Sequence, residues 1–505
     1  MQCINNKLDL VCFEIFALPT LWEPENSAFL NPPPRGAILA IPPKSVKYME
    51  TSYFRPSTRQ GNSMTQENRF TTFTTGNGTA HDFRFETLAL HAGQRPDALT
   101  GSRAVPIHQT TSFVFEDTQH AAGLFALQDY GYIYSRIGNP TVAVFEERMA
   151  TLENGVGALA TSSGQAAQFL AFFTLLEAGD EIVSAATLYG GTYTQFDVSF
   201  RKFGWNTRFV DPDDPEAFRR AANDNTRAFY CETIGNPLSN VADIEIIAQI
   251  AHEVGVPLIV DNTFASPYLC RPLDWGADIV VHSSTKFIGG HGTSIGGVIV
   301  DSGRFDWANG KFASMVNPSK GYHGVNFHET FGELGYITKA RTEGMRDMGP
   351  CPSPFNAFLF LQGLETLHLR MERHCENAQK VAEFLAQDPR VTFTNHPGLP
   401  DSPYHGLARK YLSPGYGSVF SFGIEGGFEA AVKFIEKLEI HSHLANVGDA
   451  KSLIIHPAST THRQLSEEDM KAGKISQDLI RISVGIEHID DILWDLDQAI
   501  AAANA

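Results

Sequence analysis

Short apolar runs alternate with longer helical stretches between Gly155 and Asp301. Strands separated by amphipathic helices form βαβ units, so this alternation predicts an α/β fold with a mainly parallel sheet. The expected strands are Ala158–Ala160, Glu181–Ser184, Arg227–Cys231, Pro257–Val260, Ile279–His282 and Gly297–Val300. The expected helices are Gln165–Leu176 and Ile244–Val254. The second of them is followed by Gly255, a residue typical of a helix C-terminus.

The pattern changes after this region. Residues 353–385 form one long amphipathic stretch, which predicts a helix leading out of a large domain at 141–352. Shorter apolar runs and a final acidic helix follow, and they predict a smaller C-terminal α+β domain at 353–505. These segments are Gly417–Gly423, Leu453–His456, Ile480–Val484 and Asp490–Ala502. At the other end, residues 1–80 combine clustered prolines with weak periodicity, which predicts a flexible N-terminal extension.

The composition and net charge of the chain limit the kinds of molecule that it is expected to bind. The chain has 505 residues, of which 43% are apolar, and a net charge of -18. The negative electrostatic field of such a protein repels nucleic acids and anionic membrane surfaces, so small molecules are the expected partners. The six cysteines have no paired spacing, which argues against a disulfide framework and a zinc site and favours a cytoplasmic location. No apolar run approaches the length of a membrane span, and no other metal site is expected.

A lysine and an aspartate follow two of the predicted strands. Lys286 lies in ADIVVHSSTKFIGGHG (277–292), and Asp261 closes the strand in PLIVDNTFASP (257–267). Ligands of open α/β sheets bind at such carboxyl ends. Most lysines are solvated surface residues, and Asp261 by itself fits a helix cap equally well. A buried carboxylate otherwise needs a cationic partner, and a protonated pyridine nitrogen is one.

Small polar residues at neighbouring positions could hold a phosphate. Ser163, Gly164 and Gln165 lie between a predicted strand and helix, where free N–H groups and hydroxyls bind anions. Ser283 and Thr285 add two hydroxyls just before the lysine. Turns of this kind are often rich in serine and glycine for local reasons alone, so the interpretation depends on the combination of features.

Tyr189 completes the combination. It lies on a glycine-flanked turn, LYGGTY, where its ring could cover a flat aromatic ligand, although core packing is the commoner role of an isolated tyrosine. A phosphate cradle, a ring-stacking aromatic, a carboxylate for a ring nitrogen and a strand-end amine together predict a pyridoxal 5′-phosphate (PLP) site. Lys286 would form the Schiff base.

Six motifs in order carry a family resemblance. They are YSRIGNPT (134–141), TSSGQAA (161–167), LYGGTY (188–193), DNTFASP (261–267), HSSTKFIGGHG (282–292) and RISVGIE (481–487). From about Phe85 to the C-terminus the chain resembles the PLP enzymes of cysteine and methionine metabolism. The resemblance implies a type I PLP-transferase fold, with a mostly parallel sheet of the seven-stranded type and a smaller C-terminal domain.

The resemblance also implies roles for single residues. Lys286 resembles the Schiff-base lysine, Asp261 the partner of the pyridine nitrogen, and Tyr189 a ring-stacking residue that takes part in proton transfer. The implied phosphate ligands are Ser163, Gly164, Gln165, Ser283 and Thr285. Arg481 matches the arginine that binds the substrate carboxylate, for which its planar fork is suited, and Asn446 lies near that carboxylate.

Two further residues imply an oligomer. Tyr134 and Arg136 resemble a pair that reaches the phosphate of a neighbouring subunit. Residues 81–140 would then be an arm that contributes to the partner's site. The expected assembly is a homo-oligomer with shared active sites, most simply a tetramer of dimers.

Within the family, three segments resemble the O-acetylhomoserine sulfhydrylases. They are residues 317–341, 349–378 and 444–466. The implied reaction replaces the acetyl ester group of an amino-acid substrate by sulfide, giving homocysteine and acetate. Methionine γ-lyases, cystathionine γ-synthases and O-succinylhomoserine sulfhydrylases share the cofactor residues and remain alternatives, although Gly191 lies where the lyases can carry cysteine. A non-catalytic protein that kept the fold is a further alternative.

Overall fold

The computed structural model describes residues 72–74, 80–460 and 476–503. All of them belong to one compact unit, Arg59–Ala505. The predicted N-terminal extension lies almost entirely outside the described residues, so its flexibility stays a prediction. In the described parts of the chain, no helix combines the length and the apolar character needed to cross a membrane.

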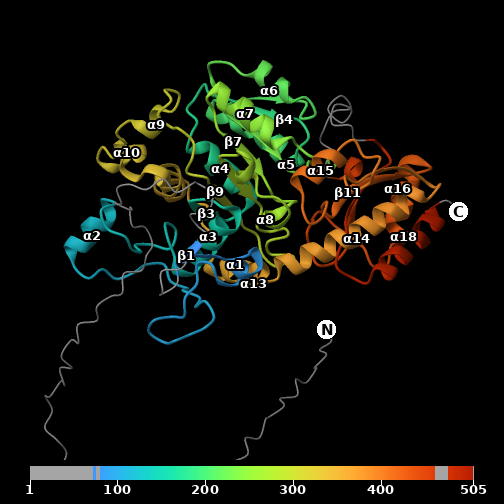
Figure 1. The fold of residues 1–505 in the computed structure, drawn as a ribbon, viewed down its shortest axis with the longest axis horizontal. Helices are drawn as coiled ribbons and strands as arrows, with labels where there is room; N and C mark the ends of the chain where they lie inside the picture. Colours follow the sequence, from blue (N-terminus) through green and yellow to red (C-terminus); the bar gives the residue numbers. More distant parts are fainter. Residues whose placement is uncertain (1–71, 75–79, 461–475, 504–505) are drawn as a thin grey trace, which may run out of the picture. The chain divides into compact units, whose positions relative to one another are not determined.

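The described residues form a seven-stranded sheet, a five-stranded sheet and a small two-stranded sheet of β1 and β2, and the two larger sheets organise the chain (Figure 1). The strands are β1 (Thr72–Thr74), β2 (Ala80–Asp82), β3 (Gly157–Thr161), β4 (Glu181–Ala185), β5 (Asn206–Val210), β6 (Thr226–Glu232), β7 (Leu258–Asp261), β8 (Ile279–His282), β9 (Gly297–Asp301), β10 (Val391–Asn395), β11 (Val419–Ile424), β12 (Ser442–His443), β13 (Leu453–Ile455) and β14 (Leu479–Ser483). The main helices are α1 (Phe85–His91), α2 (Thr118–Phe125), α3 (Pro140–Glu153), α4 (Gly164–Phe173), α5 (Gly190–Thr194), α6 (Pro215–Ala221), α7 (Ile244–Val254), α13 (Pro354–Glu365), α14 (Leu367–Gln387), α15 (His405–Tyr411), α16 (Gly427–Lys437) and α18 (Ile489–Ala503). Shorter helices are α8 (Ser266–Leu269), α9 (Ala313–Val316), α10 (Phe327–Phe331), α11 (Gly335–Lys339) and α12 (Arg346–Met348).

The large sheet has seven strands in the order β3-β9-β8-β7-β6-β4-β5. Strands β5, β4, β6, β7 and β8 run parallel, whereas β9 is antiparallel to both β8 and β3. The central strands β7, β8 and β9 are almost wholly buried, which explains their continuous apolar runs. The predicted α/β class and the mostly parallel sheet are confirmed.

The sequence pattern missed the edge strand β5. Asn206, Thr207 and Arg208 are polar and partly exposed there, so no apolar run marks it. By contrast, α7 has the predicted bounds and ends at Gly255, whose φ of 79° is the left-handed conformation that favours glycine.

The predicted long helix at 353–385 is two helices. It is interrupted at Thr366, the residue between α13 and α14. α13 is apolar around most of its surface whereas α14 is amphipathic, and no proline or glycine stands at Thr366, so the sequence pattern did not locate the break.

The smaller sheet follows these helices, in the order β10-β11-β14-β13-β12. Helices α14 and α16 pack against β10 and β11 of this sheet, and α18 packs against both helices, as the orange and red elements of Figure 1 show. Its core is made of aliphatic and phenyl groups, among them Phe420, Phe422, Ile480 and Ile482. The predicted α+β character of this region is confirmed, whereas the exact boundaries 141–352 and 353–505 stay a prediction.

Candidate functional site

Five of the predicted residues lie at one edge of the large sheet. Gly164 opens α4 after β3, Asp261 ends β7, and Ser283 and Lys286 follow β8. Tyr189 follows β4 and precedes α5. We call Gly164, Tyr189, Asp261, Ser283 and Lys286 the strand-end site. Parallel strands bring their carboxyl ends to the same edge, which is why residues so far apart in sequence meet here.

The loop after β8 holds Lys286 by backbone bonds. The Lys286 carbonyl accepts from the Gly290 N–H at 2.7 Å, and the Ser284 carbonyl accepts from the Gly289 N–H at 2.9 Å. The Lys286 amine donates to Asn446 Oδ1 at 2.6 Å, across the boundary between the two sheets. Burial, helped by the positive charge of Arg481, lowers the Lys286 pKa to about 8. An amine with this pKa is a usable nucleophile and base near neutral pH.

Asp261 is half-buried and surrounded by hydrogen-bond donors. Its Oδ1 accepts from the Thr263 N–H at 2.9 Å and from the Thr263 hydroxyl. Its Oδ2 accepts from Gln168 Nε2 at 3.1 Å and from the Tyr230 hydroxyl at 3.4 Å. Burial raises the Asp261 pKa, and the donors oppose that shift. The nearest helix, α8, has Ala265 as its N-cap, so the helix-cap interpretation of Asp261 is wrong.

The predicted phosphate residues surround the N-terminus of α4. Ser163 is its N-cap, and Ser163 Oγ accepts from the Ala166 N–H at 3.1 Å. A Cβ at position 164 would lie 2.7 Å from Ser283 Cβ, so only glycine lets the helix start approach the end of β8. Thr285 is tied to the backbone of Gly296, donating to its carbonyl at 3.2 Å and accepting from its N–H at 3.1 Å. The arrangement presents N–H groups of a helix start to one small volume.

Tyr189 stands over this edge rather than in the core. Its exposed fraction is 47%, so the core-packing interpretation is wrong. The Tyr189 N–H donates to Glu232 Oε1 at 2.7 Å, and Gln165 Nε2 donates to the Gly191 carbonyl at 2.9 Å, so the turn is held from two sides. A Cβ at Gly191 would lie 2.4 Å from Tyr189 Cε1. A side chain there would push the ring out of its position.

Arg481 comes from β14 of the smaller sheet and is only 5% exposed. Its Nη1 donates to Asn236 Oδ1 at 3.2 Å, a neutral acceptor. Burial lowers the Arg481 pKa to about 10. A buried guanidinium without a carboxylate is costly, and an anionic substrate group would relieve that cost.

Tyr134 and Arg136 lie in the stretch before α3. The Arg136 guanidinium stacks over the Tyr134 ring, 5.2 Å from its centroid. Arg136 Nε is buried and has no hydrogen-bond partner. Among the described residues, no hydrogen bond joins Arg136 to the strand-end site of its own chain.

Sequence reasoning missed four polar residues that support this site. They are Gln168, Tyr230, Glu232 and Asn236. Glu232 is the last residue of β6 and Asn236 lies just after it, in ETIGNP (232–237), and the end of that central strand was the available signal. Gln168 and Tyr230 sit inside a helix and a strand without a polar pattern, so nothing local marked them.

Among the hollows on the surface of the described residues, two adjoin elements discussed above. One lies beside Tyr189, and its lining includes Gln165, Gly191, Gln195 and Phe203. It therefore adjoins the strand-end site.

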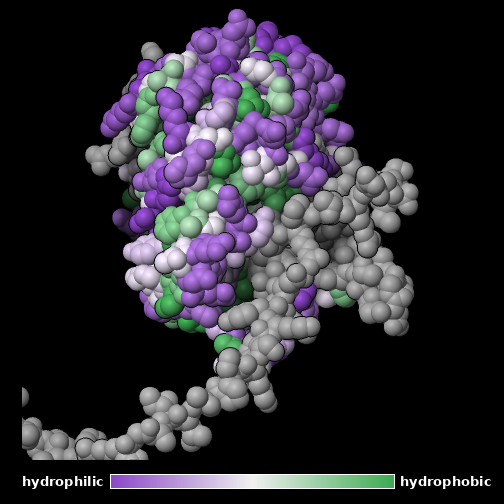
Figure 2. Space-filling view, turned by 90° about the vertical axis from the view of Figure 1, so that its left-hand side faces the viewer, coloured by the Kyte–Doolittle hydropathy of each residue, from purple (hydrophilic) through white to green (hydrophobic). Residues whose placement is uncertain are grey.

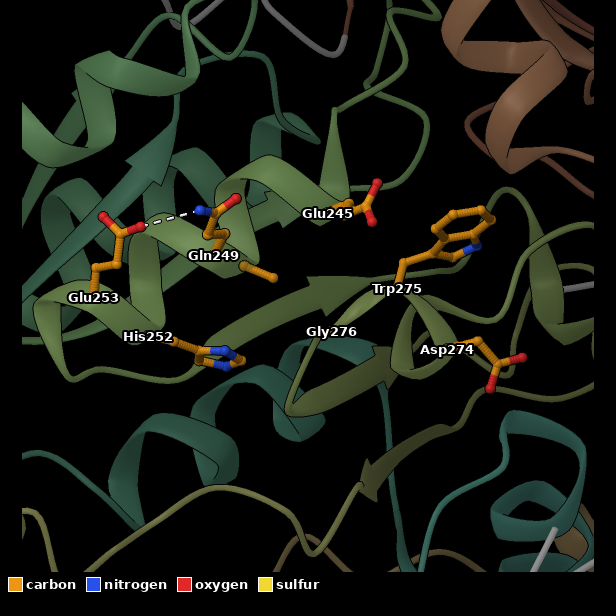
Figure 3. Close-up of a pocket in the computed structure, with 8 residues that line it drawn as sticks. Glu245, Gln249, His252, Glu253, Asp274, Trp275 and Gly276 are labelled. Carbon is orange, nitrogen blue, oxygen red and sulfur yellow. Dashed lines mark hydrogen bonds between the residues drawn. The ribbon is translucent and has the colours of Figure 1, made fainter. Parts of the chain in front are cut away.

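The second hollow is formed by α7 and the turn around Gly276 (Figure 3). Its acidic side chains are already used: Glu253 binds Arg219 at 2.6 Å and also accepts from Gln249, the bond drawn in Figure 3. Glu245 binds Lys410 at 2.8 Å. In the part of the chain that the structure describes, no cluster of metal-ligand side chains occurs.

The chemical groups of the strand-end site match the groups of PLP. The site combines a partly buried amine, a partly buried carboxylate with donors on both oxygens and the start of α4, and the buried Arg481 guanidinium, whose hydrogen bond is to a neutral amide, adds a positive charge beside it. These are the groups that would hold an aldehyde, a pyridine nitrogen, a phosphate and an α-carboxylate.

Comparison with known proteins decides the family. Residues 86–501 match the model of the family described as Cys/Met metabolism PLP-dependent enzyme. The chain belongs to this family. It is therefore a PLP-dependent enzyme, and the predicted family and cofactor are confirmed.

Curated relatives and solved structures agree with this membership. The chain is 54% identical to O-acetyl-L-homoserine sulfhydrylase of Leptospira meyeri over 84% of its length and 98% of that protein. It is 56% identical to homocysteine synthase of Schizosaccharomyces pombe, over 83% of this chain and 98% of that one. A structure described as an O-acetylhomoserine (thiol)-lyase from Campylobacter jejuni, which carries an N′-pyridoxyl-lysine-5′-monophosphate, aligns with a TM-score of 0.81 at 39% identity over 83% of this chain and all (100%) of that chain. Cystathionine γ-lyase of Lactobacillus plantarum, complexed with L-serine, aligns with a TM-score of 0.72 at 35% identity, covering 84% and 100%.

The Lys286 pKa gives the first prediction, on covalent attachment of PLP to the apoprotein. Only the unprotonated amine attacks an aldehyde, so the attachment rate should rise about tenfold per pH unit below the pKa and level off above it. With a pKa of about 8 the plateau should begin near pH 8, whereas an ordinary lysine with a pKa of 10.5 would show none before pH 10. Borohydride trapping at timed intervals, from pH 6 to 10, measures the rate. A rate still rising tenfold per unit above pH 9 would contradict the assignment of Lys286 as the attachment site.

Proposed function

We propose that this enzyme replaces the acetyl ester group of O-acetyl-L-homoserine by sulfide, producing L-homocysteine and acetate. The observation that carries the proposal is the pairing of a reactive amine with an anion site from the other sheet. Lys286 contacts Asn446 at 2.6 Å, and the buried Arg481 lies close enough to lower the Lys286 pKa. The names of the relatives from Leptospira meyeri and Schizosaccharomyces pombe supply the substrate and the product.

Each of the predicted residues would bind a different group of the cofactor or of the substrate. Lys286 Nζ would be the attachment point, Asp261 would face the pyridine nitrogen, and the Tyr189 ring would cover the ring face. Ser163, Gly164, Gln165, Ser283 and Thr285 would bind the phosphate. Arg481 would bind the substrate α-carboxylate through two parallel N–H···O bonds, with Asn446 beside it.

The same residues would move the protons. PLP, when bound, supplies an electron-accepting ring that stabilises negative charge at the substrate Cα. The Lys286 amine would remove the substrate Cα proton, and a second proton would leave Cβ. Acetate departs from Cγ with the bonding electron pair, hydrosulfide forms the new C–S bond, and the two protons return. Asn446 Oδ1 holds the Lys286 amine in place between these transfers.

Product analysis tests the proposal. The purified enzyme with O-acetyl-L-homoserine and sulfide should form homocysteine and acetate, and should turn over O-succinylhomoserine and methionine much more slowly. Release of a 2-oxo acid and ammonia in place of homocysteine would favour a γ-lyase. Absence of turnover with every substrate, in protein shown to contain PLP, would favour the non-catalytic alternative.

Gly191 gives a prediction about the lyase alternative. A cysteine there would place its Cβ against the Tyr189 ring, since even a methyl group would come within 2.4 Å of Cε1. Because small displacements of a catalytic group cost about 100-fold in rate, Gly191→Cys should lower the sulfhydrylase rate by about that factor. Tyr189 is at the surface, so the melting temperature should change little. An unchanged rate would show that the ring position has no role in this reaction.

We also propose that the enzyme is a homo-oligomer whose sites are shared between subunits. Several apolar residues of the stretch before α3 are exposed, with 99% exposure for Val114, 94% for Leu99 and 59% for Phe125. Figure 2 views the molecule from the side that carries α2 in Figure 1, and green hydrophobic residues are interspersed there among the purple ones. Exposed apolar residues on an arm are typical of an interface. The buried, unpartnered Arg136 Nε also fits a residue that acts outside its own chain.

Subunit mixing tests the shared site. Arg136→Ala and Lys286→Ala enzymes should each be nearly inactive. If Arg136 acts across the interface, exchange between them should create hybrids in which one site per pair has both groups, restoring about a quarter of wild-type activity. Mixing with tagged subunits verifies exchange. Exchange without recovered activity would mean that Arg136 serves its own chain.

We further propose a cytoplasmic location, which the unpaired thiols of Cys231, Cys270, Cys351 and Cys375 support.

A further inference from the structure

The turn that carries Arg136 lies just before α3. The Tyr134 carbonyl accepts from the N–H groups of Ile137 and Gly138, at 2.9 Å and 3.1 Å. We call residues 134–138 the arm turn. These bonds close the turn on itself, so its place on the molecule depends on contacts from other elements.

Arg341 contacts the arm turn although it lies 204 residues after Ile137 in the chain. Its Nη1 donates to the Ile137 carbonyl at 2.9 Å, and Ile137 is the residue after Arg136. Arg341 belongs to the π-helical stretch Ala340–Met345, between α11 and α12. Such stretches are rare and occur frequently at functional sites. The last residue of the segment 317–341, which resembles the sulfhydrylases, is thus bonded to the backbone beside Arg136.

The same guanidinium is bonded to the large sheet. Its Nη2 donates to Glu146 Oε2 at 2.7 Å and to the Ala158 carbonyl at 3.1 Å. Glu146 Oε1 accepts from the Ala160 N–H at 2.8 Å, and the Glu146 side chain is mostly buried. An arginine can make such divergent bonds because its planar group carries several N–H donors in a fixed fork. Arg341 and Glu146 therefore fasten the arm turn to β3, the strand that leads into α4.

The helical segment that carries Arg341 also borders the Arg136 side chain. It ends at Gly349, where a Cβ would lie 3.9 Å from Arg136 Cδ. The Pro350 carbonyl then accepts from the Ser162 N–H at 2.7 Å, directly before the predicted phosphate ligand Ser163. Two separate contacts, one with the backbone and one with the side chain, thus place Arg136 relative to this segment.

We propose that Arg341 is a positioning residue for phosphate binding: with Glu146 it fixes the arm turn on the large sheet, so that Arg136 is held where it meets the phosphate of PLP in the neighbouring subunit. The inference rests on the role proposed above for Arg136 in a shared site. Arg341 acts through the backbone of the arm turn, so its loss should weaken recognition of the phosphate and leave recognition of the pyridine ring unchanged.

Two ligands that differ only in the phosphate measure this effect. Dissociation constants of the full-length protein, freed of PLP, are determined for PLP and for pyridoxal, which has a hydroxyl in place of the phosphate ester. Arg341→Met removes the fork and should weaken PLP binding by about tenfold, the smaller end of the range for a hydrogen bond to a charged group, without changing pyridoxal binding. Arg341→Lys keeps the charge for Glu146 but not the fork. It should act in the same direction and is the second variant if Arg341→Met does not fold.

Lys339→Met is the matched control. Lys339 is a mostly buried cation of the neighbouring helix α11, and its Nζ donates to Glu343 Oε2 at 2.7 Å. Glu343 also accepts from the Ser319 hydroxyl at 2.6 Å, so this pair joins α11 to the stretch after α9. Lys339→Met should lower the melting temperature, and the ratio of the two dissociation constants should keep its wild-type value.

Mixed oligomers show in which subunit the effect arises. Tagged Arg341→Met chains and untagged wild-type chains are exchanged, a small amount of PLP is added, and borohydride fixes it to Lys286 of either chain. Before exchange the label should favour the wild-type chains about tenfold. In a hybrid, Lys286 of the variant chain meets a wild-type arm, whereas Lys286 of the wild-type chain meets the altered one. After exchange both kinds of chain should therefore carry equal label.

The same labelling with Arg136→Ala in place of Arg341→Met separates this inference from the shared site. Equal label after exchange is expected there too, and label that stays on the wild-type chains would overturn the shared site itself. If Arg136→Ala equalises the label and Arg341→Met does not, Arg341 supports only β3 of its own chain and the inference is wrong. A wild-type ratio of dissociation constants in Arg341→Met, or equal weakening of both ligands, would likewise overturn it.

Discussion

Replacing Lys286 by alanine is expected to reduce turnover by at least about 10⁴-fold, because one amine provides both the covalent attachment and the proton transfers at Cα. The fold should persist. The loop is held by the backbone bonds from Gly289 to Ser284 and from Gly290 to Lys286, which alanine retains. The variant also removes a desolvated amine, so its melting temperature should stay close to that of the wild type.

Steady-state assays with O-acetylhomoserine and sulfide measure the loss, and circular dichroism follows unfolding. Lys311→Ala is the control: Lys311 is another lysine whose pKa burial lowers, but it lies near Gly255, far along the chain from the loop after β8. It should keep wild-type activity. Small primary amines should restore part of the rate of Lys286→Ala, since they can replace a missing base. A folded variant with rates near wild type would exclude Lys286 as the catalytic amine.

Replacing Arg481 by methionine should weaken catalysis and strengthen the fold at once. Removing one partner of a buried charge pair costs about 2–5 kcal/mol, so kcat/KM should fall between about 30-fold and about 5000-fold, mostly through KM. In the free enzyme, however, the guanidinium is buried with Asn236 Oδ1 as a neutral acceptor at 3.2 Å. Substituting an apolar side chain of similar volume for a buried charge can stabilise a protein by about 1–4 kcal/mol, so the melting temperature should rise.

Arg370→Met is the control variant, and it should have the opposite effect on stability. Arg370 is also buried, and burial likewise lowers its pKa to about 10. Its Nη1 and Nη2 donate to the carbonyls of Phe287 and Gly363, each at 2.7 Å, so its removal leaves acceptors unpaired and should destabilise the protein. A destabilised Arg481→Met with unchanged KM would show that Arg481 is a structural arginine.

A second readout follows from the charge of Arg481. That charge lowers the Lys286 pKa, so Arg481→Met should shift the plateau of PLP attachment from near pH 8 towards higher pH. Burial, the larger cause, remains, so the plateau should stay below the pH expected for an ordinary lysine. An unshifted plateau would mean that Arg481 and Lys286 are not electrostatically coupled.

The sequence alone was sufficient for the central sheet and for the residues at its edge. Strands β7 and β8 are buried on both faces, which requires continuous apolar runs, and a polar residue that interrupts such a run marks the strand end. Asp261 and Lys286 were recognisable for that reason. Gly164 and Tyr189 lie in turns whose small residues are equally local features. The motifs then identified the family, because they combine these local features in a fixed order.

The sequence could not determine the edge strands of the two sheets or the point where one helix gives way to the next. Strands β5 and β10 are partly exposed, so their composition is mixed and no apolar run reveals them. The break at Thr366, between the mostly apolar α13 and the amphipathic α14, is marked by no proline or glycine at that position.

The contacts that set the chemistry join residues that are distant in the chain. Asn446 binds Lys286 from the other sheet, Asn236 binds Arg481 between the two sheets, and Arg341 binds the backbone beside Arg136 from a segment far along the chain. Strand and helix periodicity is a property of neighbouring residues, so the sequence by itself determined the elements and the residues at their ends. Burial, pKa shifts and hydrogen-bond partners arise only when separate elements exclude water from a shared volume, so the tertiary structure alone decided which amine is desolvated, which arginine binds a neutral amide and which arginine holds the arm turn.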